Sequence, residues 1–208
     1  MTPKNSLWAL LLVVAAFSIS VSSVAAEKSD DSYADFKAMM DGSFKTTGIA
    51  DKRRIYQLDF QAQCSSEKPP SEKVQAPIRA AQLASIPYPA DKQYLGDWKK
   101  GEAIATSGKG LTWTDKTPKN NGGGCYNCHQ MSPKEIAYGT IGPSLLGYGK
   151  QRGNSEEIVK YTWAKIWNAK AYNACSHMPR NGDAEILTEA EIKDVMAFLL
   201  DPASPVNQ

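Results

Sequence analysis

Five consecutive residues, Cys125-Tyr126-Asn127-Cys128-His129, constrain this chain more than any other feature of its sequence. Cys-x-x-Cys-His is the attachment signature of c-type haem. The two thiols add across the two vinyl groups of the haem, and the adjacent imidazole then reaches the iron as the proximal ligand. We therefore predict one covalently bound haem c, attached to Cys125 and Cys128 and ligated by His129.

Two other chemistries use a Cys-x-x-Cys pair, and both fit this sequence poorly. A thioredoxin-like redox site is expected in a βαβ context, whereas this motif follows the glycine-rich loop 121–124 in a chain with helical patterning. A structural zinc site needs four ligands, but the remaining candidates, Cys64, Cys175 and His177, are scattered along the chain. Haem attachment is the favoured interpretation.

The sixth iron ligand is less strongly determined than the fifth. The chain has two histidines, so a bis-imidazole site would have to use His177. Met178 stands beside it in a Met-Pro step, in the loop before the last predicted helix, where a small c-type fold needs a thioether. Met131 is too close to His129 to reach the opposite haem face, and Met196 fits the apolar stripe of a helix. We favour Met178, with His177 as the alternative.

Apolar periodicity and capping residues predict an all-α domain over residues 91–208. Three helices are expected in it. The first spans about 91–107 and ends at Gly108. The second is capped by Asn154 or Ser155 and has the apolar stripe Val159, Trp163, Ile166 and Trp167, and the third begins at the capping box Thr188–Glu191 and ends near Pro202.

Residues 27–90 are predicted to form an irregular N-terminal extension. A short helix over 35–44 is expected, and the alternation from Ile55 to Phe60 is a weak strand signal. Repeated prolines then interrupt regular structure. We interpret this segment as an arm that lies over the haem domain or over a partner.

The first 26 residues have the pattern of a secretory signal peptide. Lys4 precedes an apolar run from Leu7 to Phe17, and small residues lead to a cleavage position after Ala26. The apolar segment is shorter than the ~20 residues of a spanning helix, so no membrane anchor is expected and the mature chain would be periplasmic. Its 23 Lys and Arg against 22 Asp and Glu give no support for nucleic-acid binding.

Export also bears on the remaining cysteines. Haem attachment consumes two of the four cysteines, and an oxidising compartment favours pairing of the other two. We predict a disulfide between Cys64 and Cys175.

A turn-like sequence, Gly142-Pro143-Ser144-Leu145, follows the haem motif. We expect the carbonyl of Pro143 to accept the second ring N–H of His129 and so to fix its tautomer, as partner groups do for metal-bound histidines.

Three segments together resemble a known family. They are the haem motif with its preceding glycine (124–129), the run Ile-Ala-Tyr-Gly-Thr-Ile-Gly-Pro-Ser-Leu (136–145) and the run Cys-Ser-His-Met-Pro-Arg (175–180). They resemble SoxX, the small cytochrome subunit of the SoxXA complex of thiosulfate-oxidising bacteria. The Gly-Pro-x-Leu part is general to class I cytochromes c, and it places Pro143 and Leu145 among the residues that contact the haem. The resemblance covers about residues 91–208.

The resemblance implies a class I cytochrome c fold and a periplasmic heterodimer with a SoxA-like haem subunit. That complex is an L-cysteine S-thiosulfotransferase, in which the partner haem is catalytic and thiosulfate is joined oxidatively to a cysteine of the carrier SoxYZ. Electrons would leave through this chain to a small cytochrome c. A free-standing electron carrier of another respiratory pathway is the alternative, and a haem sensor would need an open iron position that Met178 would occupy.

Overall fold

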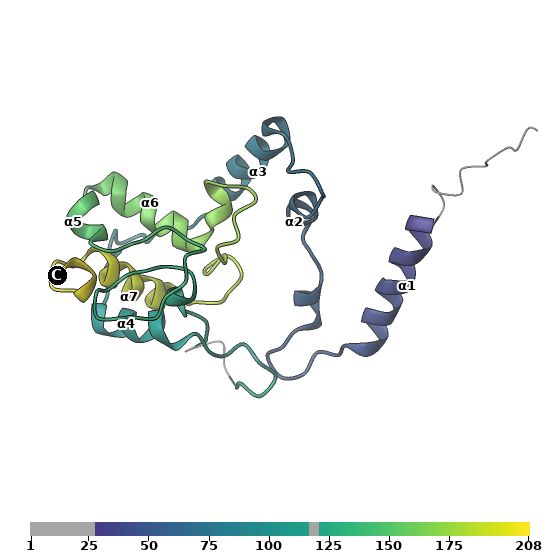
Figure 1. The fold of residues 1–208 in the computed structure, drawn as a ribbon, viewed down its shortest axis with the longest axis horizontal. Coiled ribbons are helices and arrows are strands. Elements are labelled where there is room, and N and C mark those ends of the chain that lie inside the picture. Colours follow the sequence, from purple (N-terminus) through teal and green to yellow (C-terminus); the bar gives the residue numbers. More distant parts are fainter. Residues whose placement is uncertain (1–27, 117–120) are drawn as a thin grey trace, which may run out of the picture. The chain divides into compact units, whose positions relative to one another are not determined.

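The computed structural model describes residues 28–116 and 121–208 (Figure 1). These residues form α-helices and short 3₁₀ helices, and no β-strand occurs among them, which confirms the predicted all-α class. The α-helices are α1 (Lys28–Ser43), α2 (Asp59–Cys64), α3 (Glu72–Ala84), α4 (Trp98–Ser107), α5 (Tyr148–Arg152), α6 (Glu156–Trp167) and α7 (Glu189–Leu200). The 3₁₀ helices are η1 (Lys52–Ile55), η2 (Cys125–Asn127), η3 (Ala169–Ala171) and η4 (Pro205–Asn207).

The chain divides into two compact units, residues 1–44 and 45–208. The described part of the first unit is α1, which contains most of the short helix expected over 35–44. The predicted signal peptide lies outside the described residues. No described helix is both long and apolar enough to cross a membrane.

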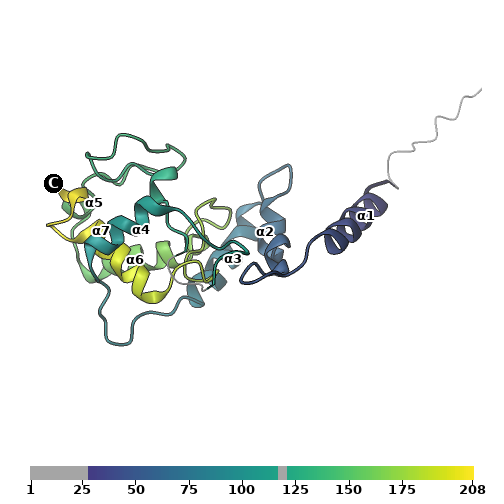
Figure 2. The ribbon, with the colours of Figure 1, turned by 90° about the horizontal axis from the view of Figure 1, so that it is seen from below.

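Helices α4 and α7 lie side by side in both ribbon views (Figures 1 and 2). Gly101 of α4 permits this close approach, because a Cβ atom there would lie 2.1 Å from the carbonyl oxygen of Asp194. The start of α7 is fixed as predicted by a capping box, in which Thr188 accepts from the backbone N–H of Glu191 and the Glu191 carboxylate accepts in return.

The core of the second unit is built around α6 and α7. Trp163, Phe198, Ile192 and Met196 are fully buried in it. The indole N–H of Trp163 donates to the carbonyl of Pro87 over 2.8 Å. The predicted stripe of α6 therefore faces the core, and the segment before α4 is fastened to it.

The N-terminal extension is more helical than its sequence indicates. The strand signal over 55–60 is wrong: η1 ends at Ile55 and α2 begins at Asp59. Pro77 lies inside α3 without ending it, although a proline in a helix interior removes one backbone hydrogen bond and its ring crowds the carbonyl four residues earlier. Helix α4 begins at Trp98, not near residue 91, because the Asp97 side chain caps it by accepting from the N–H of Lys99.

Candidate haem site

The haem-attachment motif forms a tight turn closed by its own backbone. The N–H groups of Cys128 and His129 both donate to the carbonyl of Cys125, over 3.1 and 2.9 Å. Within the described residues neither Cys125 nor Cys128 is in a disulfide. The turn therefore presents two thiols and an imidazole from one short segment.

Glycines before the motif let it approach the end of α4. Gly123 and Gly124 have φ of +82° and +66°, a region that side chains rarely adopt. A Cβ on Gly123 would lie 2.1 Å from the carbonyl oxygen of Ile104, and the N–H of Gly124 donates to that same oxygen over 3.0 Å. The loop and the helix are thus in backbone contact.

The segment after the motif runs back along it through three backbone hydrogen bonds. Gly139 donates to Tyr126 over 2.7 Å, Gly142 to Cys128 over 2.8 Å, and Leu145 to Gln130 over 2.7 Å. This pairing holds the Gly-Pro-x-Leu turn beside the haem motif.

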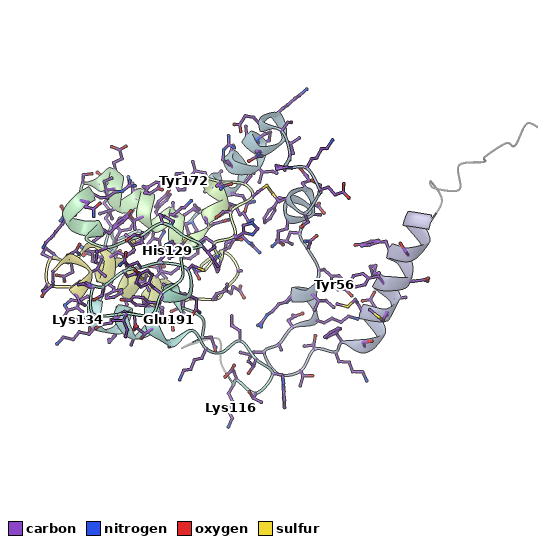
Figure 3. All side chains as sticks on the ribbon, in the orientation of Figure 1. Tyr56, Lys116, His129, Lys134, Tyr172 and Glu191 are labelled. Carbon is purple, nitrogen blue, oxygen red and sulfur yellow. A yellow bond between two sulfur atoms is a disulfide. The ribbon has the colours of Figure 1, made fainter. Side chains whose placement is uncertain are left out.

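His129 is oriented by that turn. Its Nδ1 lies 2.7 Å from the carbonyl oxygen of Pro143, and because a carbonyl can only accept, Nδ1 carries the proton. The Nε2 atom is left with its lone pair for a metal. Gly142 lies against the ring, since a Cβ there would be 2.2 Å from Cε1 of His129. Figure 3 shows the His129 side chain within the helical unit.

The thiol environment favours thioether attachment over thiol redox chemistry. Cys125 packs against the hydrophobic core, and this burial raises the pKa of its thiol to about 11. Redox-active Cys-x-x-Cys motifs instead use a lowered thiol pKa. A zinc site is also disfavoured, because the described residues contain no cluster of three or more His, Cys, Asp or Glu that could hold a metal ion.

The methionines differ sharply in their availability as a sixth ligand. Met131 and Met196 are 1 % and 0 % exposed in the core, which matches the packing role expected of Met196. Met178 is half-buried and packs against the same core as Cys125 and Leu145. His177, the alternative, is exposed. Of these three methionines, Met178 is the one whose thioether is not enclosed in the core.

The loop that carries Met178, residues 172–188 between η3 and α7, is called the ligand loop after the predicted sixth ligand, and it is tied to the extension. Cys64 and Cys175 form the expected disulfide, with S–S 2.03 Å and Cα–Cα 5.3 Å (Figure 3). Cys175 lies three residues before Met178, so the covalent link joins the end of α2 to the ligand loop.

The donor set fits a covalently attached haem: two thiols outside the disulfide, an imidazole with a fixed tautomer and a thioether beside the same core. An all-α domain with this site is a c-type cytochrome domain, a class of electron-transfer protein. Residues 105–201 match the family model described as cytochrome c. The fold is therefore that of cytochrome c, as expected, and the cofactor is covalently bound haem c.

A relative among curated proteins is the "Uncharacterized lipoprotein" of Aquifex aeolicus (strain VF5). The two are 42 % identical over 126 residues, which cover 60 % of this chain and 59 % of the relative. The aligned part thus spans less than two thirds of the relative's length.

Two features of the site were not predicted from the sequence. One is the contact of Gly142 with the His129 ring, for which the glycine before Pro143 was the available signal. The other is a hydrogen bond from Lys170 to the ligand loop, for which the sequence contains no signal.

Proposed function

We propose that this chain is the electron-transfer subunit of a SoxXA-type complex, with His129 and Met178 as the axial ligands of its haem. The observation that carries the proposal is the exposure of apolar side chains in the segment 136–145, one of the runs on which the resemblance to SoxX rests. It is hydrogen-bonded along the haem motif, yet Ile136 and Ile141 are 91 % and 77 % exposed and Tyr138 is 42 % exposed. Exposed apolar side chains grouped beside a functional site are typical of a docking surface.

The oxidative joining of thiosulfate to a carrier cysteine, the reaction of a SoxXA-type complex, requires an electron acceptor such as haem c. Joining thiosulfate to a cysteine thiol of the carrier SoxYZ forms a sulfur–sulfur bond and releases two electrons and one proton. Haem c takes up electrons one at a time. In this chain Cys125 and Cys128 hold the group covalently, His129 is oriented by Pro143, and the Met178 thioether favours the reduced state relative to a second imidazole. The electrons would then pass from a SoxA-like haem subunit to a small cytochrome c.

A periplasmic location follows from the same proposal. The predicted cleavage after Ala26 would export the chain, and the Cys64–Cys175 disulfide suits an oxidising compartment. The name of the Aquifex relative includes the word lipoprotein, which is consistent with a role outside the cytoplasm.

The test is purification of the chain from its native host without overexpression. We expect it to elute with a second haem-bearing subunit, and the pair to join thiosulfate to a carrier cysteine when an electron acceptor is supplied. Elution as a single-haem monomer that is reduced by another respiratory donor would instead support the alternative, a free-standing carrier.

A further inference from the structure

Lys170 is a buried cation outside the haem motif. It lies in η3, directly after α6, and is 8 % exposed. Within the described parts of the chain it forms no salt bridge. Burial, and to a smaller extent the positive charge of Arg180, lowers the pKa of its ammonium group. Because burying an unpaired ammonium is unfavourable, its position needs a compensating interaction.

That interaction is made with the loop that carries Met178. The ammonium of Lys170 donates to the carbonyl oxygen of Ser176 over 2.7 Å. The hydroxyl of Ser176 in turn accepts from the backbone N–H of Met178 over 3.2 Å. Two hydrogen bonds therefore connect the buried lysine to the backbone of the residue assigned as the sixth ligand.

The backbone of Lys170 is fixed by a second set of hydrogen bonds, which leads to α3. Its backbone N–H donates to the side-chain oxygen of Asn168 over 3.1 Å. Asn168 is fully buried and donates through its amide to Gln82 of α3 over 2.7 Å. The lysine is thus fixed between the extension and the ligand loop, independently of the neighbouring disulfide.

The loop has a competing ligand in the position next to Met178. His177 is exposed, and imidazole is a common haem ligand. Whether the thioether or the imidazole occupies the iron depends on how firmly the loop backbone is held. The carbonyl of Ser176, which accepts from Lys170, lies one residue before His177 and two before Met178.

We propose that Lys170 is a positioning residue that selects Met178 over His177 as the sixth ligand by holding the carbonyl of Ser176. This inference rests on the proposed His129–Met178 ligation. It gives a residue outside the haem motif a part in determining which side chain is the sixth ligand.

Lys170→Met in the full-length holoprotein removes the charged donor and keeps the apolar stem. The first readout is the weak sulfur-to-iron band of the oxidised protein at the red edge of the visible spectrum. The second is the apparent dissociation constant for added imidazole, which binds when the thioether leaves. We expect the band to weaken and imidazole to bind about tenfold more tightly, the size of effect of one lost hydrogen bond to a charged group.

Lys165→Met is the matched control. Lys165 is a half-buried lysine of α6 whose ammonium lies over the Tyr172 ring, 5.7 Å from its centroid, and no hydrogen bond to the ligand loop is formed by it among the described residues. Lys165→Met removes the same charge as Lys170→Met but no hydrogen bond to the ligand loop. The band and the imidazole affinity of this control should therefore stay within about twofold of the parent. Lys170→Gln, whose side chain is one atom shorter and uncharged, should reproduce the effect and replaces the methionine variant if that variant does not fold.

Equal imidazole affinities in Lys170→Met, Lys170→Gln and Lys165→Met would overturn the inference. Met178→Ala separates this outcome from failure of the ligand assignment. If Met178→Ala abolishes the band while the Lys170 variants match the control, the role of Lys170 alone is rejected. If Met178→Ala keeps the band, the ligand assignment is rejected and the role of Lys170 with it.

Discussion

The imidazole of His129 is oriented mainly by backbone atoms. The Pro143 carbonyl accepts its Nδ1 proton, and Gly142 leaves room for the ring. Side-chain substitutions elsewhere can preserve both features, but any side chain at position 142 must displace the ring or the turn.

Gly142→Ala should therefore loosen His129 without preventing covalent attachment, because the two thiols are unchanged. Overpacking of this kind costs about 1–3 kcal/mol. Denaturant unfolding of the holoprotein should show that loss, and the oxidised spectrum should gain a high-spin component. Gly42→Ala, at a position in α1 with no atom within 4 Å of the added carbon, is the control. An unchanged spectrum and stability in Gly142→Ala would contradict the assigned contact.

At this scale the sequence was informative wherever a short motif determines the chemistry. The spacing of the Cys-x-x-Cys-His motif and the small number of histidines predicted the haem-binding residues, and the usual hydrogen bond of a metal-bound histidine predicted the role of the Pro143 carbonyl. The expected export to an oxidising compartment predicted the pairing of Cys64 with Cys175. Lys170 was not, because its role depends on a contact with Ser176 that only the folded η3 and ligand loop bring together.

Among the elements, the extension and the haem domain are joined at several points. The disulfide links the end of α2 to the ligand loop, Gln82 of α3 bonds to Asn168, and Pro87 accepts from Trp163. Residues 45–97 are consequently part of the same compact unit as the haem motif.

Removing the disulfide with Cys64→Ser and Cys175→Ser should destabilise the holoprotein by about 2–5 kcal/mol, because the bond constrains an unfolded loop with a sequence separation of 111. The ligand loop should loosen as well, so the sulfur-to-iron band should disappear at a lower denaturant concentration. Haem attachment should persist.

Non-reducing digestion and mass spectrometry of the unmodified chain test the bond itself. We expect one peptide pair joined through Cys64 and Cys175. Uptake of an alkylating reagent by the Cys175 peptide without prior reduction would contradict this expectation.

Element boundaries were predicted where a cap or a glycine defines them and missed where tertiary contacts do. Gly108 ends α4 in the left-handed region, and the capping box begins α7, both as expected. The alternation over 55–60 does not become a strand, since a short isolated strand has no partner to pair with. Helix α4 begins at Trp98, and its cap, Asp97, is a residue that commonly begins helices; the sequence did not single it out, because the backbone of Gly96 and Asp97 is held outside the helix by α7, Gly96 donating to the carbonyl of Lys193 and Asp97 to the carboxylate of Asp194.

At the scale of the whole molecule, the chain has the chemistry of an electron-transfer protein, which accepts electrons and passes them on. With the haem attached to Cys125 and Cys128 as predicted, the other two of its four cysteines are those of the disulfide. No free thiol remains that could act as a nucleophile toward thiosulfate.

The isolated holoprotein should therefore accept and donate one electron per chain but should not join thiosulfate to a carrier cysteine. Stopped-flow reduction measures the first property, and mass analysis of the carrier after incubation with thiosulfate measures the second. A thiosulfate adduct formed by this chain without a partner subunit would exclude the relay role.

The measurement that tests the central assignment most directly is the red-edge absorption of the oxidised holoprotein in three forms: unmodified, Met178→Ala and His177→Ala. Ligation by His129 and Met178 predicts a weak sulfur-to-iron band that Met178→Ala abolishes and His177→Ala leaves in place. A protein without the band, in which His177→Ala removes the sixth ligand, would contradict the assignment.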